Sequence, residues 1–176
     1  MLNAMDGIDS KIPQPSQSQS PPNREVFRMY LDSCILVKLL IREPDSEFYA
    51  RLVEGHPVSS SMLAFTEVWS AMLARERAQL IGTRLRLEAW QRFDDQMRTQ
   101  MIDLSPISEA IIRRAHWILG RVHPKVPLRS LDALHLATAD QLQDWPLVTS
   151  DQRLREAALH LGYPLNDLPG PILPAY

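Results

Sequence analysis

Cysteine is nearly absent from this chain of 176 residues, which contains only Cys34. A single cysteine excludes an intrachain disulfide, as is common for proteins of a reducing compartment. The chain also lacks any run approaching the ~20 apolar residues of a membrane span. Residues 1–25 lack the apolar core of a signal peptide. We therefore expect a cytoplasmic protein with no membrane partner.

A large excess of charge of either sign is also missing. The 19 basic and 21 acidic residues leave a formal net charge of -2, so the composition gives no support for a basic surface over the whole chain. A local basic patch would still suffice to bind nucleic acid. With 45% hydrophobic and 23% charged residues, the composition is that of one ordinary globular domain.

The first segment of the chain differs from the rest. Residues 1–24 are rich in Pro, Gln and Ser and contain few large apolar side chains. Such a segment buries too little surface to offset its ordering entropy, so we predict that it is disordered or is a mis-annotated extension. Translation starting at Met29, rather than at Met1 or Met5, is one explanation. The predicted globular domain is residues 25–176.

Short apolar runs alternate with amphipathic stretches from residue 26 onward. This alternation predicts an α/β fold in which helices flank a mainly parallel sheet. Ser46, Ser61 and Ser130 are the expected N-caps of three helices, and Gly82 is an expected helix stop. The expected strands are 26–31, 56–61, 101–105 and 146–150, and the expected helices are 33–43, 46–55, 62–82, 83–100, 108–120, 130–143 and 151–162.

Two acids directly follow apolar strand candidates. Asp32 ends the run VFRMYL, and Asp151 follows LVTS in the same way. In an open parallel sheet, ligands bind just beyond the carboxyl ends of the strands. The two carboxylates would approach each other if their strands are neighbours.

Two further acids occupy expected helices. Asp132 is the second residue after the expected N-cap Ser130, where the helix dipole alone favours a negative charge. Glu67 lies in a stretch from Met62 to Ala74 in which only Thr66, Glu67 and Ser70 are polar. A helix that is apolar nearly all round is buried, so we expect Glu67 to be buried and to need a partner.

Four gathered carboxylates would repel one another. At an effective dielectric constant near 20, two like charges 4 Å apart cost about 4 kcal/mol. Either some carboxylates stay protonated through raised pKa values, or a hard divalent cation neutralises the cluster. Oxygen ligands suit Mg²⁺ or Mn²⁺, and Mg²⁺ held by few carboxylates accepts phosphate oxygens.

Four short motifs together resemble the PIN domains. LDSCILVKLL is similar to their opening strand, Asp and small hydroxyl residue, and FTEVWSAM to their Thr/Ser-Glu pair on a helix. SLDALHLATA and LVTSDQRL are similar to the third and fourth acidic elements. The motifs stand in family order and cover residues 26 to about 162. Within the family, the chain resembles VapC-type toxins of toxin–antitoxin pairs, which implies a PIN-like α/β/α fold.

The resemblance implies a metal-dependent endoribonuclease toxin of a type II toxin–antitoxin system. Mg²⁺ or Mn²⁺ would activate a water that attacks the RNA phosphorus and leaves a 3′-hydroxyl and a 5′-phosphate. The implied partners are RNA, a cognate antitoxin and a second copy of the chain in a homodimer. The implied metal-binding and catalytic residues are Asp32, Glu67, Asp132 and Asp151, with Ser33 and Thr149 in support.

Several of these residues have alternative interpretations. Cys34 stands where the family more often has Ser or Asn, and it is either a nucleophile or a small packed side chain. His135 shares a helix face with Asp132, so it is either a metal ligand or a packed core histidine. Arg129 and Arg153 flank the predicted acids and are candidates for RNA contacts, although a solvated helix surface also explains Arg153.

Three other functions compete with the nuclease. A receiver-like signalling domain would need paired acids after its first strand, and Asp32 has no acidic neighbour. A haloacid-dehalogenase-type phosphatase would need an Asp where Cys34 stands. An inactive PIN-like scaffold that only binds a partner remains the main alternative, although all four acids are present.

Overall fold

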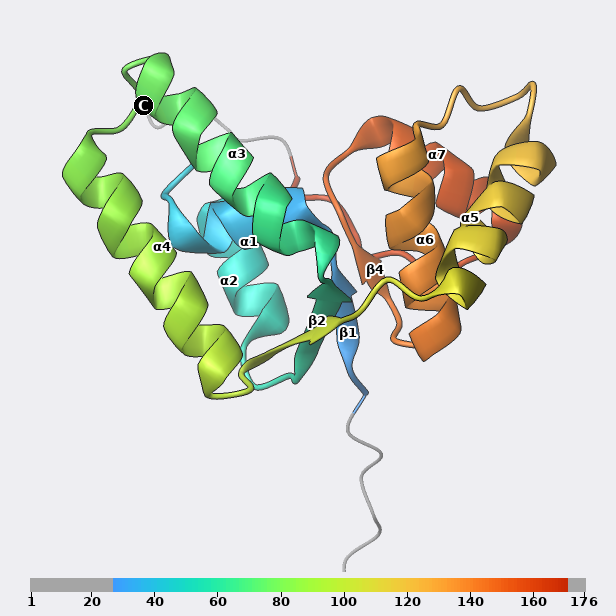
Figure 1. The fold of residues 1–176 in the computed structure, drawn as a ribbon, viewed down its shortest axis with the longest axis horizontal. Coiled ribbons are helices and arrows are strands. Elements are labelled where there is room, and N and C mark those ends of the chain that lie inside the picture. The colour runs from blue at the N-terminus through green and yellow to red at the C-terminus, as the bar shows by residue number, and fades with distance from the viewer. Residues whose placement is uncertain (1–26, 171–176) are drawn as a thin grey trace, which may run out of the picture.

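A computed structural model describes residues 27–170, and a parallel sheet lies at its centre (Figure 1). In this range the sheet has four strands in the order β3-β2-β1-β4, and every neighbouring pair is parallel. The strands are β1 (Met29–Leu31), β2 (Val58–Ser61), β3 (Ile102–Ser105) and β4 (Leu147–Val148). The expected mainly parallel α/β architecture is confirmed.

The connections place helices on both faces of the sheet. Figure 1 shows α1 to α4 on one side of the strands and α5 to α7 on the other. The helices are α1 (Ser33–Leu40), α2 (Ser46–Val53), α3 (Leu63–Arg77), α4 (Thr83–Arg98), α5 (Glu109–Val122), α6 (Ser130–Leu142) and α7 (Gln152–Leu161). Because α5 and α6 carry the chain from β3 to the opposite edge, the strand order reverses between β1 and β4. Ligands bind at such reversal points in open α/β sheets.

Alternate residues of β1 face the two layers of helices. Leu31 packs in the core cluster formed with α1 to α4, while Tyr30 packs in the cluster formed with α5 to α7. Successive residues of a strand point to opposite faces, and helices cover both faces, so both side chains are 0% exposed. The strand thus carries a buried polar group, the Tyr30 hydroxyl, toward the helices that bear Asp132 and Asp151.

Several helix ends differ from the expected positions. The N-cap of α6 is Arg129 rather than Ser130, so Asp132 is the third residue after the cap. Met62 rather than Ser61 caps α3, because Ser61 belongs to the buried strand β2. The expected helix over 62–82 ends at Arg77, and Gly82 is the N-cap of α4.

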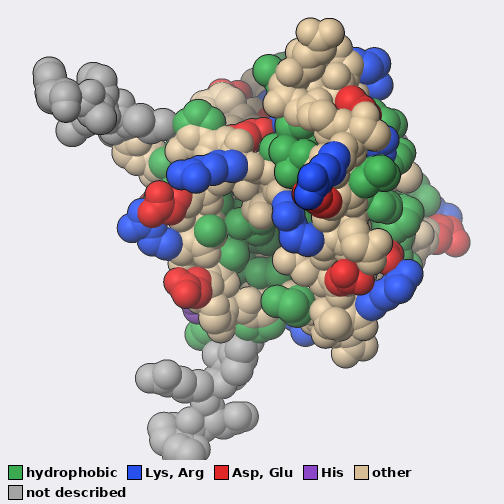
Figure 2. All heavy atoms as spheres, turned by 90° about the vertical axis from the view of Figure 1, so that its left-hand side faces the viewer, with side chains coloured by type: hydrophobic (Ala, Val, Ile, Leu, Met, Phe, Trp, Pro, Cys, Tyr) green, Lys and Arg blue, Asp and Glu red, His purple; other side chains and the backbone are tan. Residues whose placement is uncertain are grey.

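The surface carries charges of both signs. Figure 2 looks onto the side of the molecule formed by α1 to α4 and shows Lys/Arg and Asp/Glu side chains interspersed among hydrophobic ones. The mixture of signs on this face agrees with the small net charge. Among residues 27–170, no helix is long and apolar enough to cross a membrane. The prediction for residues 1–24 lies outside the described residues.

Candidate active site

The four acids line one cavity of about 260 Å³ at the reversal point of the sheet. Ser33, Cys34, Val37, Ala71, Arg75 and His135 complete its wall. Asp32 follows β1, Asp151 follows β4 as the N-cap of α7, Glu67 lies on α3 and Asp132 lies on α6. The structure therefore brings together side chains that are up to 119 positions apart in the sequence.

Asp32 is held by neighbours on the adjacent strand end. Leu31 pairs with Val148, and the Asp32 amide donates a hydrogen bond to the Val148 carbonyl over 3.0 Å. The Thr149 hydroxyl and the Cys34 thiol both donate to Asp32 Oδ2, at 2.8 and 3.0 Å. These bonds hold a nearly buried carboxylate, which is 7% exposed, in one orientation.

Thr149 joins Asp32 to Asp151. Its Oγ1 donates to Asp32 and accepts a hydrogen bond from the Asp151 amide over 3.0 Å. The Asp151 carboxylate in turn accepts from the Leu154 amide at the start of α7, over 2.9 Å through Oδ1. An acid at this position is favoured by the positive end of the helix dipole.

Glu67 is bound by two donors through the same oxygen. Its Oε2 accepts from the Ser33 hydroxyl at 2.5 Å and from His135 Nε2 at 2.7 Å. Burial alone would raise the pKa of Glu67, but the hydrogen bond and charge of His135 and the bond from Ser33 outweigh it and lower the pKa. Glu67 is consequently an ionised carboxylate with a fixed orientation.

The helix around Glu67 is less buried than its sequence suggested. Only Ala64, Val68 and Met72 of α3 are buried, whereas Phe65 is 39% exposed. The Glu67 side chain itself is 25% exposed. The expectation of an enclosed helix was wrong, because α3 packs against α1 and α4 along one face and leaves the rest open to solvent. Glu67 still has the partners that the sequence argument required.

His135 is a buried connection between the sheet and the cavity. It is 2% exposed, and its Nδ1 lies 2.8 Å from the Tyr30 hydroxyl, while its Nε2 faces Glu67 and Ser33. Burial would lower the pKa of His135, but the bond to Glu67 and the charges of Asp32, Glu67 and Asp132 raise it. Since Nε2 carries the hydrogen that it donates to Glu67, it has no free lone pair for a cation. This favours the packed, hydrogen-bonded histidine over the metal ligand.

Asp132 is held by the backbone at the start of α6. Its Oδ2 accepts a hydrogen bond from the Arg129 amide over 3.3 Å. Burial, together with the charges of Asp151 and Asp32, raises the pKa of Asp132. Burial is the main cause, and the contribution of the two neighbouring charges is the repulsion expected from the sequence.

A shared pattern emerges from these contacts. Each of the four carboxylates accepts hydrogen bonds through one oxygen, while its second oxygen accepts none from the described residues. The second oxygens are Asp32 Oδ1, Glu67 Oε1, Asp132 Oδ1 and Asp151 Oδ2. Four carboxylates, each with one fixed and one available oxygen, suit a hard divalent cation such as Mg²⁺ or Mn²⁺.

The four carboxylates do not by themselves form a complete set of metal ligands. Within residues 27–170, no group of three or more His, Cys, Asp or Glu side chains already surrounds a common point at metal-binding distance. Mg²⁺ commonly keeps several waters and takes only one or two carboxylates directly. A cation in this cavity would therefore need waters among its ligands.

Cys34 contributes to the packing of the site rather than to nucleophilic chemistry. Burial, and secondarily the charge of Asp32, raises the pKa of its thiol to about 12. The un-ionised thiol donates to Asp32 and lies 3.4 Å from the Ser150 hydroxyl. A thiol that stays protonated is a poor nucleophile, so the small packed side chain is the better interpretation.

The arginines near the cavity differ from those that the sequence favoured. Arg129 is exposed and Arg153 half-buried, and neither lines the cavity, so their RNA contacts stay predictions. Arg75 lines it instead, and the sequence offered a signal, because Glu67, Ala71 and Arg75 recur every four residues on one helix face. Tyr30 and Asn166 were also missed. Asn166 accepts from the Thr149 amide through its side chain, across 17 positions.

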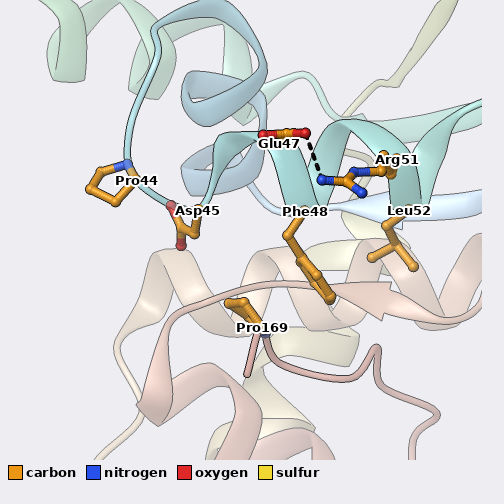
Figure 3. A pocket seen from close by; sticks show the side chains of 7 residues that line it. All are labelled: Pro44, Asp45, Glu47, Phe48, Arg51, Leu52 and Pro169. Atoms are coloured by element: carbon orange, nitrogen blue, oxygen red, sulfur yellow. Dashed lines mark hydrogen bonds and ion pairs between the residues drawn. The ribbon is translucent and has the colours of Figure 1, made fainter. Parts of the chain in front are cut away.

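A larger cavity lies elsewhere in the molecule. It measures about 540 Å³ and is lined by Pro44, Asp45, residues of α2 and Pro169 (Figure 3). Phe48 and Leu52 form its apolar wall, and Glu47 forms an exposed ion pair with Arg51 over 2.6 Å. The four acids line the smaller cavity instead, so the size of a cavity does not identify the active site in this protein.

This chain is similar to known proteins over most of its length. Residues 29–159 match the PIN domain family. The chain belongs to the PIN domain family. Ribonuclease VapC46 of Mycobacterium tuberculosis is 36% identical over 138 residues, which are 76% of this chain and 92% of that relative. The resemblance to VapC-type PIN domains is confirmed.

Solved structures share the fold of this PIN domain. VapC20 of Mycobacterium tuberculosis, described as a Sarcin-Ricin loop cleaving toxin, aligns with a TM-score of 0.57 at 17% identity and covers 73% of this chain and 94% of its own. VapBC2 of Rickettsia felis, bound to a DNA fragment from its promoter, aligns with a TM-score of 0.58 at 13% identity, covering 79% and 97%. At these identities the likeness concerns the fold.

Proposed function

We propose that this PIN domain is the ribonuclease toxin of a type II toxin–antitoxin pair and cleaves RNA with the help of Mg²⁺ or Mn²⁺. The observation that carries the proposal is the cavity in which four acids each keep one oxygen available. Its position at the reversal point of the sheet suits a substrate-binding site. The 36% identity to a VapC ribonuclease supports RNA as the substrate.

The residues of the chain divide the work of the site. Asp32, Glu67, Asp132 and Asp151 would hold the cation, which supplies charge neutralisation and an activated water for hydrolysis of a phosphodiester. Thr149 and Cys34 fix the orientation of Asp32. Ser33 and His135 fix Glu67, so that its Oε1 stays directed away from their hydrogen bonds.

The proposed protein partner is a cognate antitoxin. VapBC2, which shares the fold, supports a partner of the VapB type. Homodimerisation, which the family resemblance implies, stays a prediction. Arg129 and Arg153 stay candidate RNA contacts because both lie close to Asp132 in the chain or in space.

Cleavage of RNA by the purified full chain tests the proposal. Structured RNA such as total tRNA would be incubated with Mg²⁺, with Mn²⁺ and with EDTA, using Asp151→Asn as the matched inactive control. We expect fragments with 5′-phosphate ends that require both the metal and Asp151. Equal cleavage in EDTA, or equal cleavage by Asp151→Asn, would contradict the assignment. The inactive scaffold would be favoured if no RNA is cut while the variant and the parent behave alike.

A further inference from the structure

Arg75 is a basic side chain in the wall of an otherwise acidic cavity. It lies two helical turns after Glu67 on the same face of α3, with the small side chain of Ala71 between them. At 1.5 Å per residue, eight residues span about 12 Å along the helix. The wall therefore has carboxylates at one end and a guanidinium at the other.

The guanidinium is fixed by a network outside the four acids. Nε donates to Glu43 Oε1 over 3.0 Å, Nη2 donates to the same oxygen, and Nη1 donates to the Ala71 carbonyl over 3.2 Å. Lys38 binds the other oxygen of Glu43 over 2.9 Å and also binds Asp45 over 2.7 Å. Glu43 is thereby held between two cations, which lowers its pKa in spite of partial burial.

Part of the guanidinium remains available to a ligand. Arginine has five N–H donors, and the three hydrogen bonds to Glu43 and Ala71 use three of them. The Arg75 side chain is 27% exposed. Among residues 27–170, none of the ion pairs joins Arg75 to the four acids of the cavity. Its charge is thus presented beside the acids without being neutralised by them.

We propose that Arg75 forms a phosphate-binding subsite for the RNA strand, next to the scissile phosphate, and that Glu43 is its positioning residue. The proposal rests on the proposed ribonuclease function. A strand whose scissile phosphate lies at the acids would place a neighbouring phosphate along α3, where the fixed guanidinium donates two N–H groups. A planar, pre-oriented fork is well suited to phosphate oxygens.

Arg86 offers a matched control. Like Arg75, it is an arginine paired with a carboxylate: its Nε on α4 donates to Glu76 on α3 over 2.6 Å. Its guanidinium also stacks on Trp69 at 4.8 Å. It does not line the acidic cavity. Replacing Arg75 or Arg86 removes a comparable ion pair, but only Arg75 stands where RNA would lie.

The test measures binding of a fluorescent single-stranded oligoribonucleotide at several salt concentrations. The full chain carries Asp151→Asn throughout, which keeps the RNA intact, and is compared with added Arg75→Gln, Arg75→Lys, Glu43→Gln or Arg86→Gln. Losing the charged guanidinium and its two N–H donors should weaken binding about tenfold or more in Arg75→Gln. The slope of log affinity against log salt should fall by about 0.7, the value for one phosphate contact on a single strand.

The other variants separate binding from packing. Arg75→Lys should retain the salt slope and recover part of the affinity, because it keeps the charge. Glu43→Gln should weaken binding with the slope unchanged, and Arg86→Gln should change neither quantity. An unchanged affinity and slope in Arg75→Gln, or an equal loss in Arg86→Gln, would overturn the subsite. Failure of the parent chain to cleave RNA would count against the proposed function alone, since binding is measured independently of cleavage.

Discussion

The four acids of the cavity fall into two pairs that are held in different ways. Asp32 and Glu67, the side-chain-held pair, receive hydrogen bonds from Thr149, Cys34, Ser33 and His135. Asp132 and Asp151, the helix-held pair, receive them from backbone amides at the starts of α6 and α7. Replacing a side chain can remove the donors of the first pair, whereas those of the second persist as long as the helices do.

This difference indicates which hydrogen bonds of the site can be removed by substitution without unfolding the protein. Backbone donors at helix ends belong to the fold itself. Side-chain donors can be exchanged one at a time, and the change in activity then measures how much the orientation of one carboxylate matters. The predictions below follow this order, from loss of an acid to loss of a dispensable donor.

Loss of one acid from either pair should have the largest effect. We expect Asp32→Asn and Asp151→Asn each to lower kcat/KM for RNA by about a thousandfold or more, because charge stabilisation at a metal centre is lost. The melting temperature of the metal-free protein should not fall, since a mutually repelling charge is removed. Glu47→Gln in the larger cavity serves as the control and should leave cleavage unchanged. Substantial activity in either Asn variant would show that its acid lies outside the reaction.

Loss of a donor to the side-chain-held pair should have the next largest effect. His135→Asn removes the bond to Glu67 Oε2, and we expect kcat to fall about 10- to 100-fold, as is typical for residues that orient metal ligands. KM for RNA should change little, because His135 is only 2% exposed. His116→Asn, at an exposed position on α5, is the matched control. A raised KM with unchanged kcat would contradict an orienting role.

Tyr30→Phe should lower activity indirectly, because Tyr30 contacts His135 rather than an acid of the cavity. The change leaves the buried His135 Nδ1 without its hydroxyl partner, at a cost of about 1–3 kcal/mol in the free energy of unfolding. We expect a smaller loss of kcat than in His135→Asn. Urea unfolding and initial cleavage rates would be measured in the same preparations. If His135→Asn and the double variant have equal rates, the effect of Tyr30 passes through His135, whereas fully additive losses would contradict that connection.

Cys34→Ser should have the smallest effect. A serine hydroxyl can replace the thiol as a donor to Asp32, so we expect cleavage within about threefold of the parent. Because the pKa of the thiol is raised to about 12, iodoacetamide at pH 8 should not inactivate the parent chain. If Cys34→Ser lost as much activity as Asp32→Asn, the interpretation of Cys34 as a nucleophile would be favoured again.

The sequence predicted the parallel α/β fold and the sheet edge at which the acids lie. Asp32 and Asp151 could be placed there because each follows an apolar strand run. Their adjacency could not be derived, since the pairing of β1 with β4 depends on a crossover through α5 and α6. The position of Asp132 one residue further from its cap had a different cause, because Arg129 offered no side-chain capping signal.

The network behind the acids could not be predicted in the same way. The bonds of His135 to Tyr30 and to Glu67 join residues 105 and 68 positions apart, and an apolar sequence context pointed only to burial. Arg75 was missed as well, although its spacing from Glu67 on one helix face is visible in the sequence. Sequence periodicity gives the face of an element, whereas the partner of that face comes only from the fold.

Calorimetric titration of the metal-free full chain with Mn²⁺ tests the central claim most directly, namely that the available carboxylate oxygens form one cation site. The account predicts that the parent and Cys34→Ser bind Mn²⁺ alike, while Asp32→Asn and Asp151→Asn, one from each pair, both lose most of that binding. Absence of binding by the parent, or equal binding by the parent and both Asn variants, would contradict it.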